Sequence, residues 1–174
     1  HEDPLVRMSF LILFQDYVGT EDLNLMVRSC LISSSFESIY AGLLFVVKTG
    51  RFELISLYEE MLKEKCMDDV KCKFLLESII YLRDKDEYCY VKYLESLELV
   101  QLNELYVISD NWKFDESIVS TIFDAVENRV YNIYSMFGET DSPEDKLAYL
   151  NELRSCYLII DAHKQYYMIE DMLS

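Results

Sequence analysis

Pairs of adjacent carboxylates are the residues of this sequence whose type and spacing could do chemistry. Two neighbouring acids are what divalent-metal binding and acid–base catalysis require. In an acidic chain the same pairs also fit the exposed face or the N-terminal cap of a helix, which is the simpler interpretation. The pairs therefore predict neither a metal site nor a catalytic acid; they are Glu59-Glu60, Asp68-Asp69 and Glu170-Asp171.

Other signatures of catalysis or cofactor binding are missing from the sequence. His163 has no Ser or Cys nucleophile at a recognisable spacing. No two of the four glycines lie close enough to form a phosphate-binding loop, and two histidines with no Cys-x-x-Cys give zinc no ligand set. We therefore expect no enzymatic activity and no cofactor. An enzyme of unrecognised class stays open as a hypothesis that ranks third, after the two protein-binding hypotheses given below.

The charge balance points to a protein partner. The 174 residues carry a formal net charge of −16 at pH 7, from 32 acidic and 16 basic side chains. Such a field repels phosphate backbones and anionic membranes. The most apolar run, residues 9–14, is also far too short to span a bilayer. We expect a partner with a basic surface, no membrane, and no direct contact with nucleic acid through a large surface.

The cysteines indicate a reducing compartment. Their number is odd, their spacing does not repeat, and each lies inside an apolar helical pattern rather than a Gly-rich loop. A disulfide framework would need a different arrangement. The sequence therefore predicts reduced thiols in the cytoplasm or nucleus at Cys30, Cys66, Cys72, Cys89 and Cys156.

The elements that must position these residues are helices. Residues of the apolar set make up 51% of the chain, and only four Gly and two Pro are present, too few for the frequent turns of a sandwich or barrel. The clearest helix follows a capping box at residues 34–37 and ends at Gly50. It carries a stripe that should be buried, above all at Tyr40, Leu43 and Leu44; the full stripe is Phe36, Ile39, Tyr40, Leu43, Leu44 and Val47.

The remaining pattern predicts about nine or ten helices in one domain over residues 1–174, arranged as stacked antiparallel hairpins. The first helix is apolar on most faces, so we expect it to be covered on several sides. Thr20 is the expected cap of the second helix, and Ser142 with Pro143 opens the last part after a loop at 138–142. The other expected helices are 51–65, 68–83, 87–97, 102–109 and 115–137.

Residues 36–47 (FESIYAGLLFVV) resemble the second hairpin of the middle domain of initiation factor 4G. The similarity continues in order through 73–80 (KFLLESII), 108–114 (ISDNWKF) and 122–130 (IFDAVENRV), and through Asp145-Lys146 with Tyr149-Leu150. Two departures are a trimmed first hairpin and a last pair of helices whose basic residues are reduced to Lys146 and Arg154.

The resemblance implies a HEAT-like superhelix of hairpins whose loop edge holds a DEAD-box RNA helicase in translation, splicing or ribosome assembly. The chain would be a non-catalytic scaffold in RNA processing. In that family the contacts lie on turns at one edge and near the last hairpins. This makes Trp112 the expected exposed aromatic anchor, and the candidate partner-binding residues are Asp84, Lys85, Asp86, Asp110, Asn111, Trp112, Glu139 and Asp141.

Two tyrosine clusters are further interface candidates because tyrosine combines a large apolar ring with a polar tip. They are Tyr88-Cys89-Tyr90 with Tyr93, and Tyr166-Tyr167.

The alternative hypothesis is a viral Bcl-2-like helical bundle that binds partner helices in host-defence evasion. Asn111-Trp112 resembles the central Asn-Trp of that family, although Lys113-Phe114 stands where Gly-Arg should follow. This alternative predicts one helix buried on all sides and a groove for amphipathic helices. Stacked hairpins predict instead that every helix keeps one exposed face.

Overall fold

The computed structural model describes residues 3–159 and residue 173. These residues form nine α-helices, three short 3-10 helices and no strand, which confirms the predicted all-α class. The chain divides into two compact units, His1–Tyr90 and Val91–Ser174. A single domain over residues 1–174 stays a prediction.

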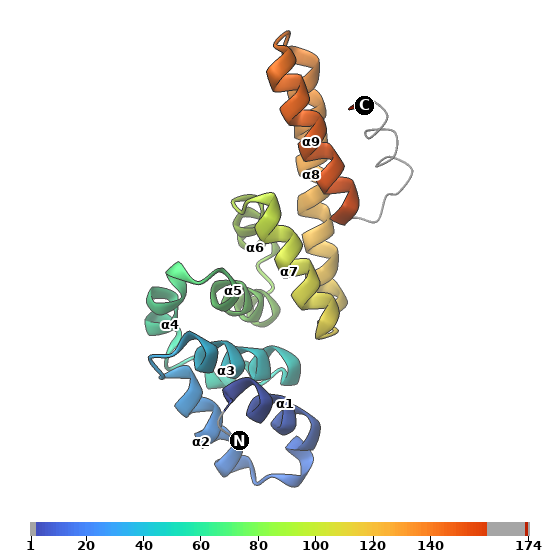
Figure 1. Ribbon diagram of the computed structural model, residues 1–174. Helices are drawn as coiled ribbons and strands as arrows, with labels where there is room; N and C mark the ends of the chain where they lie inside the picture. The colour runs from blue at the N-terminus through green and yellow to red at the C-terminus, as the bar shows by residue number, and fades with distance from the viewer. Residues whose placement is uncertain (1–2, 160–172, 174) are drawn as a thin grey trace. The chain divides into compact units, whose positions relative to one another are not determined.

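The first unit is organised around α3 (Phe36–Thr49), which packs against α1, α2 and α5 (Figure 1). Every residue from 41 to 47 of α3 is buried, so this helix is enclosed over two turns. The other elements of this unit are α1 (Pro4–Phe14), η1 (Gln15–Tyr17), α2 (Thr20–Leu31), η2 (Phe52–Leu54), α4 (Glu59–Lys65), η3 (Cys66–Asp68) and α5 (Val70–Asp84).

The predicted α3 stripe is confirmed in its centre and wrong at its start. Leu43 and Leu44 are fully buried. Tyr40 is only half-buried, and Phe36, in the first turn of the helix, is exposed by 42% although its carbonyl accepts from Cys72 Sγ of α5 at 3.5 Å. Gly50 ends the helix as predicted, with a left-handed φ of 69° and its N–H donated to the Val46 carbonyl at 3.0 Å.

A glycine sets how closely α2 and α3 approach. A Cβ atom at Gly42 would lie 3.1 Å from both Cys30 Cβ and Leu31 Cδ2 of α2. Contacts this short require a neighbour to move, so Gly42 allows a helix separation that alanine would not.

Three local predictions in the first unit are corrected. Thr20 is the first residue of α2 rather than its cap, because the chain turns one residue earlier at Gly19. The cap of α3 is Ser35, whose hydroxyl oxygen accepts the Ser38 N–H at 3.4 Å and donates to Glu37 at 2.6 Å, so a serine cap replaces the capping box expected from Ser34. Residues 51–65 form η2, a turn and α4 instead of one helix, which places consecutive Leu54 and Ile55 both in the core.

The α5 and α6 ends agree with the sequence. Asp69 caps α5 by accepting the Cys72 N–H at 2.7 Å, as expected for an acid at a helix N-terminus. Helix α6 (Glu87–Glu95) follows a two-residue joint and crosses the boundary between the two units.

The second unit contains α7 (Leu99–Asn111), α8 (Glu116–Glu139) and α9 (Pro143–Ile159), and α8 and α9 lie side by side as a hairpin (Figure 1). The inner face of α8 carries the buried side chains of Ile118, Ile122, Val126 and Ile133, whereas Val130 is half-buried. Gly138 belongs to α8 rather than to the loop, because its backbone keeps helical geometry and the helix continues to Glu139. Ser142 accepts the Asp145 N–H at 3.2 Å, so the predicted cap of α9 is confirmed.

Candidate functional site

The joint between α5 and α6 is the strongest candidate site among the residues proposed from sequence. All six residues from Asp84 to Cys89 are exposed. Lys85 has a left-handed backbone, with φ 58°, and donates its N–H to the Tyr81 carbonyl at 2.8 Å. This turn ends α5 abruptly and presents the flanking acids to solvent. We call residues 84–89 the acidic joint.

Both aspartates of the acidic joint are held in fixed positions. Asp84 accepts two hydrogen bonds from Arg83, at 2.6 Å from Nε and 2.7 Å from Nη2, and this lowers the pKa of Asp84. Asp86 accepts the Cys89 N–H at 3.0 Å, which caps α6 and lowers the pKa of Asp86. Both carboxylates are therefore ionised at neutral pH.

Arg83 also links the acidic joint to α4 through an ion pair. Its Nη1 lies 2.6 Å from Oε2 of Glu59 on α4, and Glu59 in turn accepts from Lys63 at 2.8 Å. Charged groups that share partners in this way restrict one another's rotamers. The sequence could not show this network, because Glu59 and Arg83 lie on different helices.

Tyr88 completes the acidic joint; the sequence proposed it as part of a tyrosine cluster, apart from the eight candidate partner-binding residues. Its side chain is 72% exposed. Tyr90, two residues later and on the opposite face of α6, is buried, stacks on Tyr81 at 4.6 Å and shares a 2.7 Å hydrogen bond with Ser78. The predicted tyrosine cluster thus divides into a core residue and an exposed aromatic residue next to ionised acids.

The second candidate joint is less accessible than expected. Trp112 is half-buried at the C-terminal cap of α7, so it is not the fully exposed anchor that the sequence suggested. Asp110 pairs with Lys113 at 2.8 Å, and Asn111 is exposed. The side chain of Phe114 is buried two residues after Trp112, and this burial keeps the backbone at the tryptophan close to the core.

The third candidate region lies at the α8–α9 turn. Glu139 and Asp141 are both exposed, as predicted. Between them, Thr140 donates its hydroxyl to Asp145 at 3.3 Å. Glu139 is the last residue of α8 rather than part of a loop, which limits its backbone freedom. Among the described residues, the exposed aromatic side chain nearest in sequence to this turn is Tyr134 on α8.

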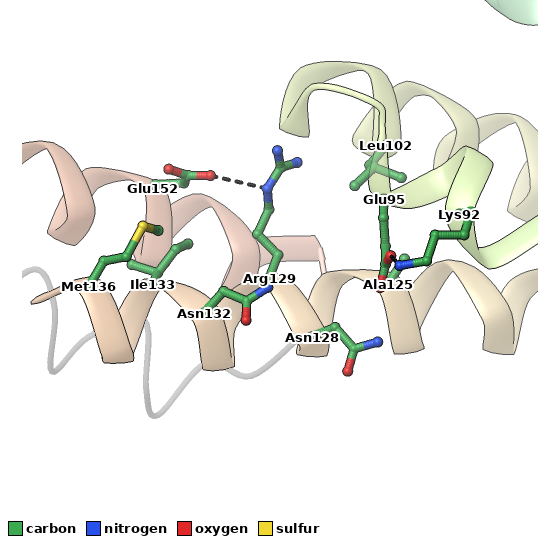
Figure 2. Close-up of a pocket in the computed structure, with 10 residues that line it drawn as sticks. All are labelled: Lys92, Glu95, Leu102, Ala125, Asn128, Arg129, Asn132, Ile133, Met136 and Glu152. Carbon is green, nitrogen blue, oxygen red and sulfur yellow. Dashed lines mark hydrogen bonds and ion pairs between the residues drawn. The ribbon is translucent and has the colours of Figure 1, made fainter.

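A groove of about 400 Å³ runs along the second unit (Figure 2). Its apolar lining comes from Leu102, Ala125, Ile133 and Met136. Its charges are paired: Arg129 Nε lies 3.2 Å from Glu152, as the dashed line in Figure 2 marks, and Lys92 lies 2.8 Å from Glu95. Arg129 also donates to the Leu97 carbonyl at 3.0 Å. Such a groove can take an apolar side chain of a partner.

The acid pairs found in the sequence serve structural roles where they are described. Glu59 is bound by Arg83 and Lys63, which lowers its pKa, and Glu60 is exposed beside Lys63. Burial raises the pKa of Glu77, which lines a groove with Lys63 and Lys73. Glu170-Asp171, His163 and Tyr166-Tyr167 lie outside the described residues.

The described residues contain no group of three metal-ligating side chains, and no helix among them is long and apolar enough to cross a membrane. All five cysteines are thiols; four are buried and Cys89 is exposed.

Comparison of the chain with protein families, curated proteins and solved structures found no match. The resemblance to the initiation-factor middle domain therefore has no independent support.

Proposed function

We propose that this protein is a non-catalytic binding scaffold that takes up a basic surface of a protein partner at the acidic joint. One observation carries the proposal: ionised Asp84 and Asp86 flank a turn that also presents the exposed ring of Tyr88. Charged residues around an aromatic anchor are the usual composition of a protein interface.

The charges and the ring have separate roles in this proposal. The net charge of −16 steers a basic partner toward the chain and raises the association rate. Tyr88 provides the apolar area that slows dissociation, since tyrosine loses little conformational entropy when it is buried. The Arg83 network keeps the turn ordered before binding, which reduces the entropy lost on association.

The finer proposal is that the partner is a DEAD-box RNA helicase, as the resemblance to the initiation-factor middle domain implies. The candidate joints at Asp110 to Trp112 and at Glu139 and Asp141 would then give secondary contacts. Translation, splicing and ribosome assembly all stay open as the pathway.

Binding of a purified DEAD-box helicase from the source cell, measured at low and raised salt, tests both levels of the proposal. The joint variant combines Asp84→Asn, Asp86→Asn and Tyr88→Ala. Asparagine removes charge but still caps α6 and still accepts from Arg83, so the fold is kept. The control variant combines Glu64→Gln, Asp68→Asn and Leu57→Ala, which removes the same charge and one exposed apolar side chain elsewhere in the first unit.

We expect the joint variant to bind about tenfold more weakly or worse, and the control variant to stay close to wild type. Raised salt should weaken wild-type binding. If both variants lose the same affinity, the loss comes from the change in net charge, and this result would contradict a binding site at the acidic joint. If the protein binds another basic protein but no helicase, the proposal of a binding scaffold is kept and the proposal of a helicase partner is rejected.

A second candidate function, binding of partner helices by a Bcl-2-like bundle, is favoured by one observation. Residues 41–47 of α3 are buried on all sides, as that alternative predicts for its central helix and as stacked hairpins do not. However, Asn111 and Trp112, which carry the likeness, lie at the end of α7 and not in α3. Titration with the amphipathic partner helices of that family tests it, and absence of binding would remove it.

A further inference from the structure

Helix α1 has apolar side chains on most of its circumference, and among its described side chains the buried ones lie on one side. Arg7 is its single charged residue. On the inner side Met8 and Leu11 are buried in the core of the first unit, where α1 packs on α3. The outer side consists of large apolar side chains that are exposed by 46%, 58%, 75% and 86%, in the order Val6, Phe10, Leu13 and Tyr17.

These four residues form one continuous stripe. They follow the spacing i, i+4, i+7 and i+11, and so project from the same face of α1 and its extension in η1. At a rise of about 1.5 Å per residue the stripe is about 16 Å long, or three helical turns. We call Val6, Phe10, Leu13 and Tyr17 the α1 stripe.

A groove borders the α1 stripe on the side of α2. It has a volume of about 420 Å³ and is lined by Val6, Arg7, Phe10 and Leu11 of α1 and by Met26 of α2. Val6 and Phe10 belong to both features. The stripe and the groove therefore make one surface between two helices, the shape that receives the apolar face of a third helix.

The charges around this surface select the partner. Four exposed acids surround the stripe in sequence: Asp3 caps the start of α1, Asp16 precedes Tyr17, and Glu21 and Asp22 open α2. The basic side chains on the two helices are Arg7 of α1 and Arg28 in the last turn of α2, so acids outnumber bases by four to two. A helix that lies along the stripe would therefore place its polar flanks against carboxylates, and lysine or arginine there would be stabilised.

We propose that the α1 stripe and its groove dock a basic amphipathic helix of a protein partner. A second copy of this chain would bring the same carboxylates against these four, which opposes self-association. An anionic membrane meets the same repulsion, together with a net charge of −16. This surface is distinct from the acidic joint, so the inference does not depend on the function proposed above.

A labelled designed peptide tests the proposal on the full chain. The peptide is an amphipathic helix of Leu and Lys about as long as the stripe, and two further peptides have either the same residues in scrambled order or Glu in place of Lys. Phe10→Ser/Leu13→Ser removes the centre of the stripe without changing charge. Leu57→Ser is the matched control, because Leu57 is exposed by 78% and Leu13 by 75%.

We expect the Leu–Lys peptide to bind the wild type and Leu57→Ser alike, and Phe10→Ser/Leu13→Ser about tenfold more weakly or not at all. The scrambled and glutamate peptides should bind weakly to all three. Equal binding of the designed and scrambled peptides, or no loss in the double variant, would overturn the proposal.

The wild type and the two variants also test two other possible occupants of the α1 stripe, a second copy of the chain and a membrane. Sedimentation of wild type as a dimer that the double variant abolishes would assign the stripe to a second copy and overturn the proposal. Stripe-dependent binding to phosphatidylserine vesicles, in the absence of peptide binding, would assign it to a membrane and overturn it as well. An unchanged melting temperature in both variants shows that the comparison concerns binding rather than folding.

Discussion

Helices α1 and α3 have nearly the same composition and opposite environments. Each has a single basic residue and a majority of large apolar side chains. Residues 41–47 of α3 are buried by α1, α2 and α5, whereas α1 meets neighbours on its inner side and leaves its outer side exposed. The expectation that the first helix is covered on several sides is therefore wrong for its outer side, because composition does not specify how many neighbours a helix meets.

The largest expected difference between core and surface is in the rate at which cysteine thiols react. Cys30 lies between α2 and α3 and is buried, whereas Cys89 in the acidic joint is exposed. A thiol-specific reagent should modify Cys89 more than about a thousandfold faster than Cys30, since reaching the core requires an opening that costs several kcal/mol.

The reaction of Cys89 should also accelerate as the pH rises. A hydrogen bond with Asp86 raises the pKa of Cys89, so the reactive thiolate is scarce at neutral pH and increases above it. Mass spectrometry of the modified native and denatured protein measures both effects. Detection of fewer than five thiols after denaturation without reductant would contradict the free cysteines of the structure.

Truncation of a leucine tests the two helices directly. Leu43→Ala in α3 should lower the free energy of unfolding by about 2–5 kcal/mol, because it leaves a cavity in a fully enclosed position. Leu13→Ala on the outer side of α1 should change it by less than about 0.5 kcal/mol. Urea unfolding followed by circular dichroism gives both values, and similar losses would show that the outer side of α1 is also core.

Filling the close contact between α2 and α3 should have a smaller effect. In Gly42→Ala the new methyl group meets Cys30 and Leu31 at 3.1 Å, so we expect a loss of about 1–3 kcal/mol despite alanine's higher helix propensity. A gain in stability in the same urea experiment would mean that α2 and α3 are farther apart than described.

The same substitution at an open position should have the opposite sign. Gly138 lies in the last turn of α8, and a Cβ there meets nothing within 4 Å. Gly138→Ala should therefore raise the melting temperature slightly, by the equivalent of about 0.5 kcal/mol. A loss would indicate that this turn requires the conformational freedom of glycine.

Local signals in the sequence were sufficient for most of the fold. Ser142 caps α9 and Gly50 ends α3 as expected, and Asp69 of the Asp68-Asp69 pair caps α5, because capping depends on residues only two to four positions apart. Residues 51–58 were not predictable in this way. Their apolar spacing fits a helix, but packing beneath α3 imposes a 3-10 turn.

The sequence indicated which charged residues the candidate site contains, but not which of its aromatic side chains are exposed. Asp84 and Asp86 stand out in the sequence as a polar joint. The exposure of Tyr88 and the burial of Tyr90 depend on the direction in which α6 faces, and the half-burial of Trp112 depends on Phe114. Such properties arise from tertiary packing, which a pattern of residue types does not specify.

Affinity purification from the source cell with three baits tests the central claim of a protein-binding scaffold most directly. The baits are the wild type, the joint variant and the control variant with the same charge. We predict that a basic partner, and a DEAD-box helicase among the proteins recovered, is enriched by the wild type and the control and depleted by the joint variant. Recovery of the same proteins in equal amounts by all three baits would contradict the account.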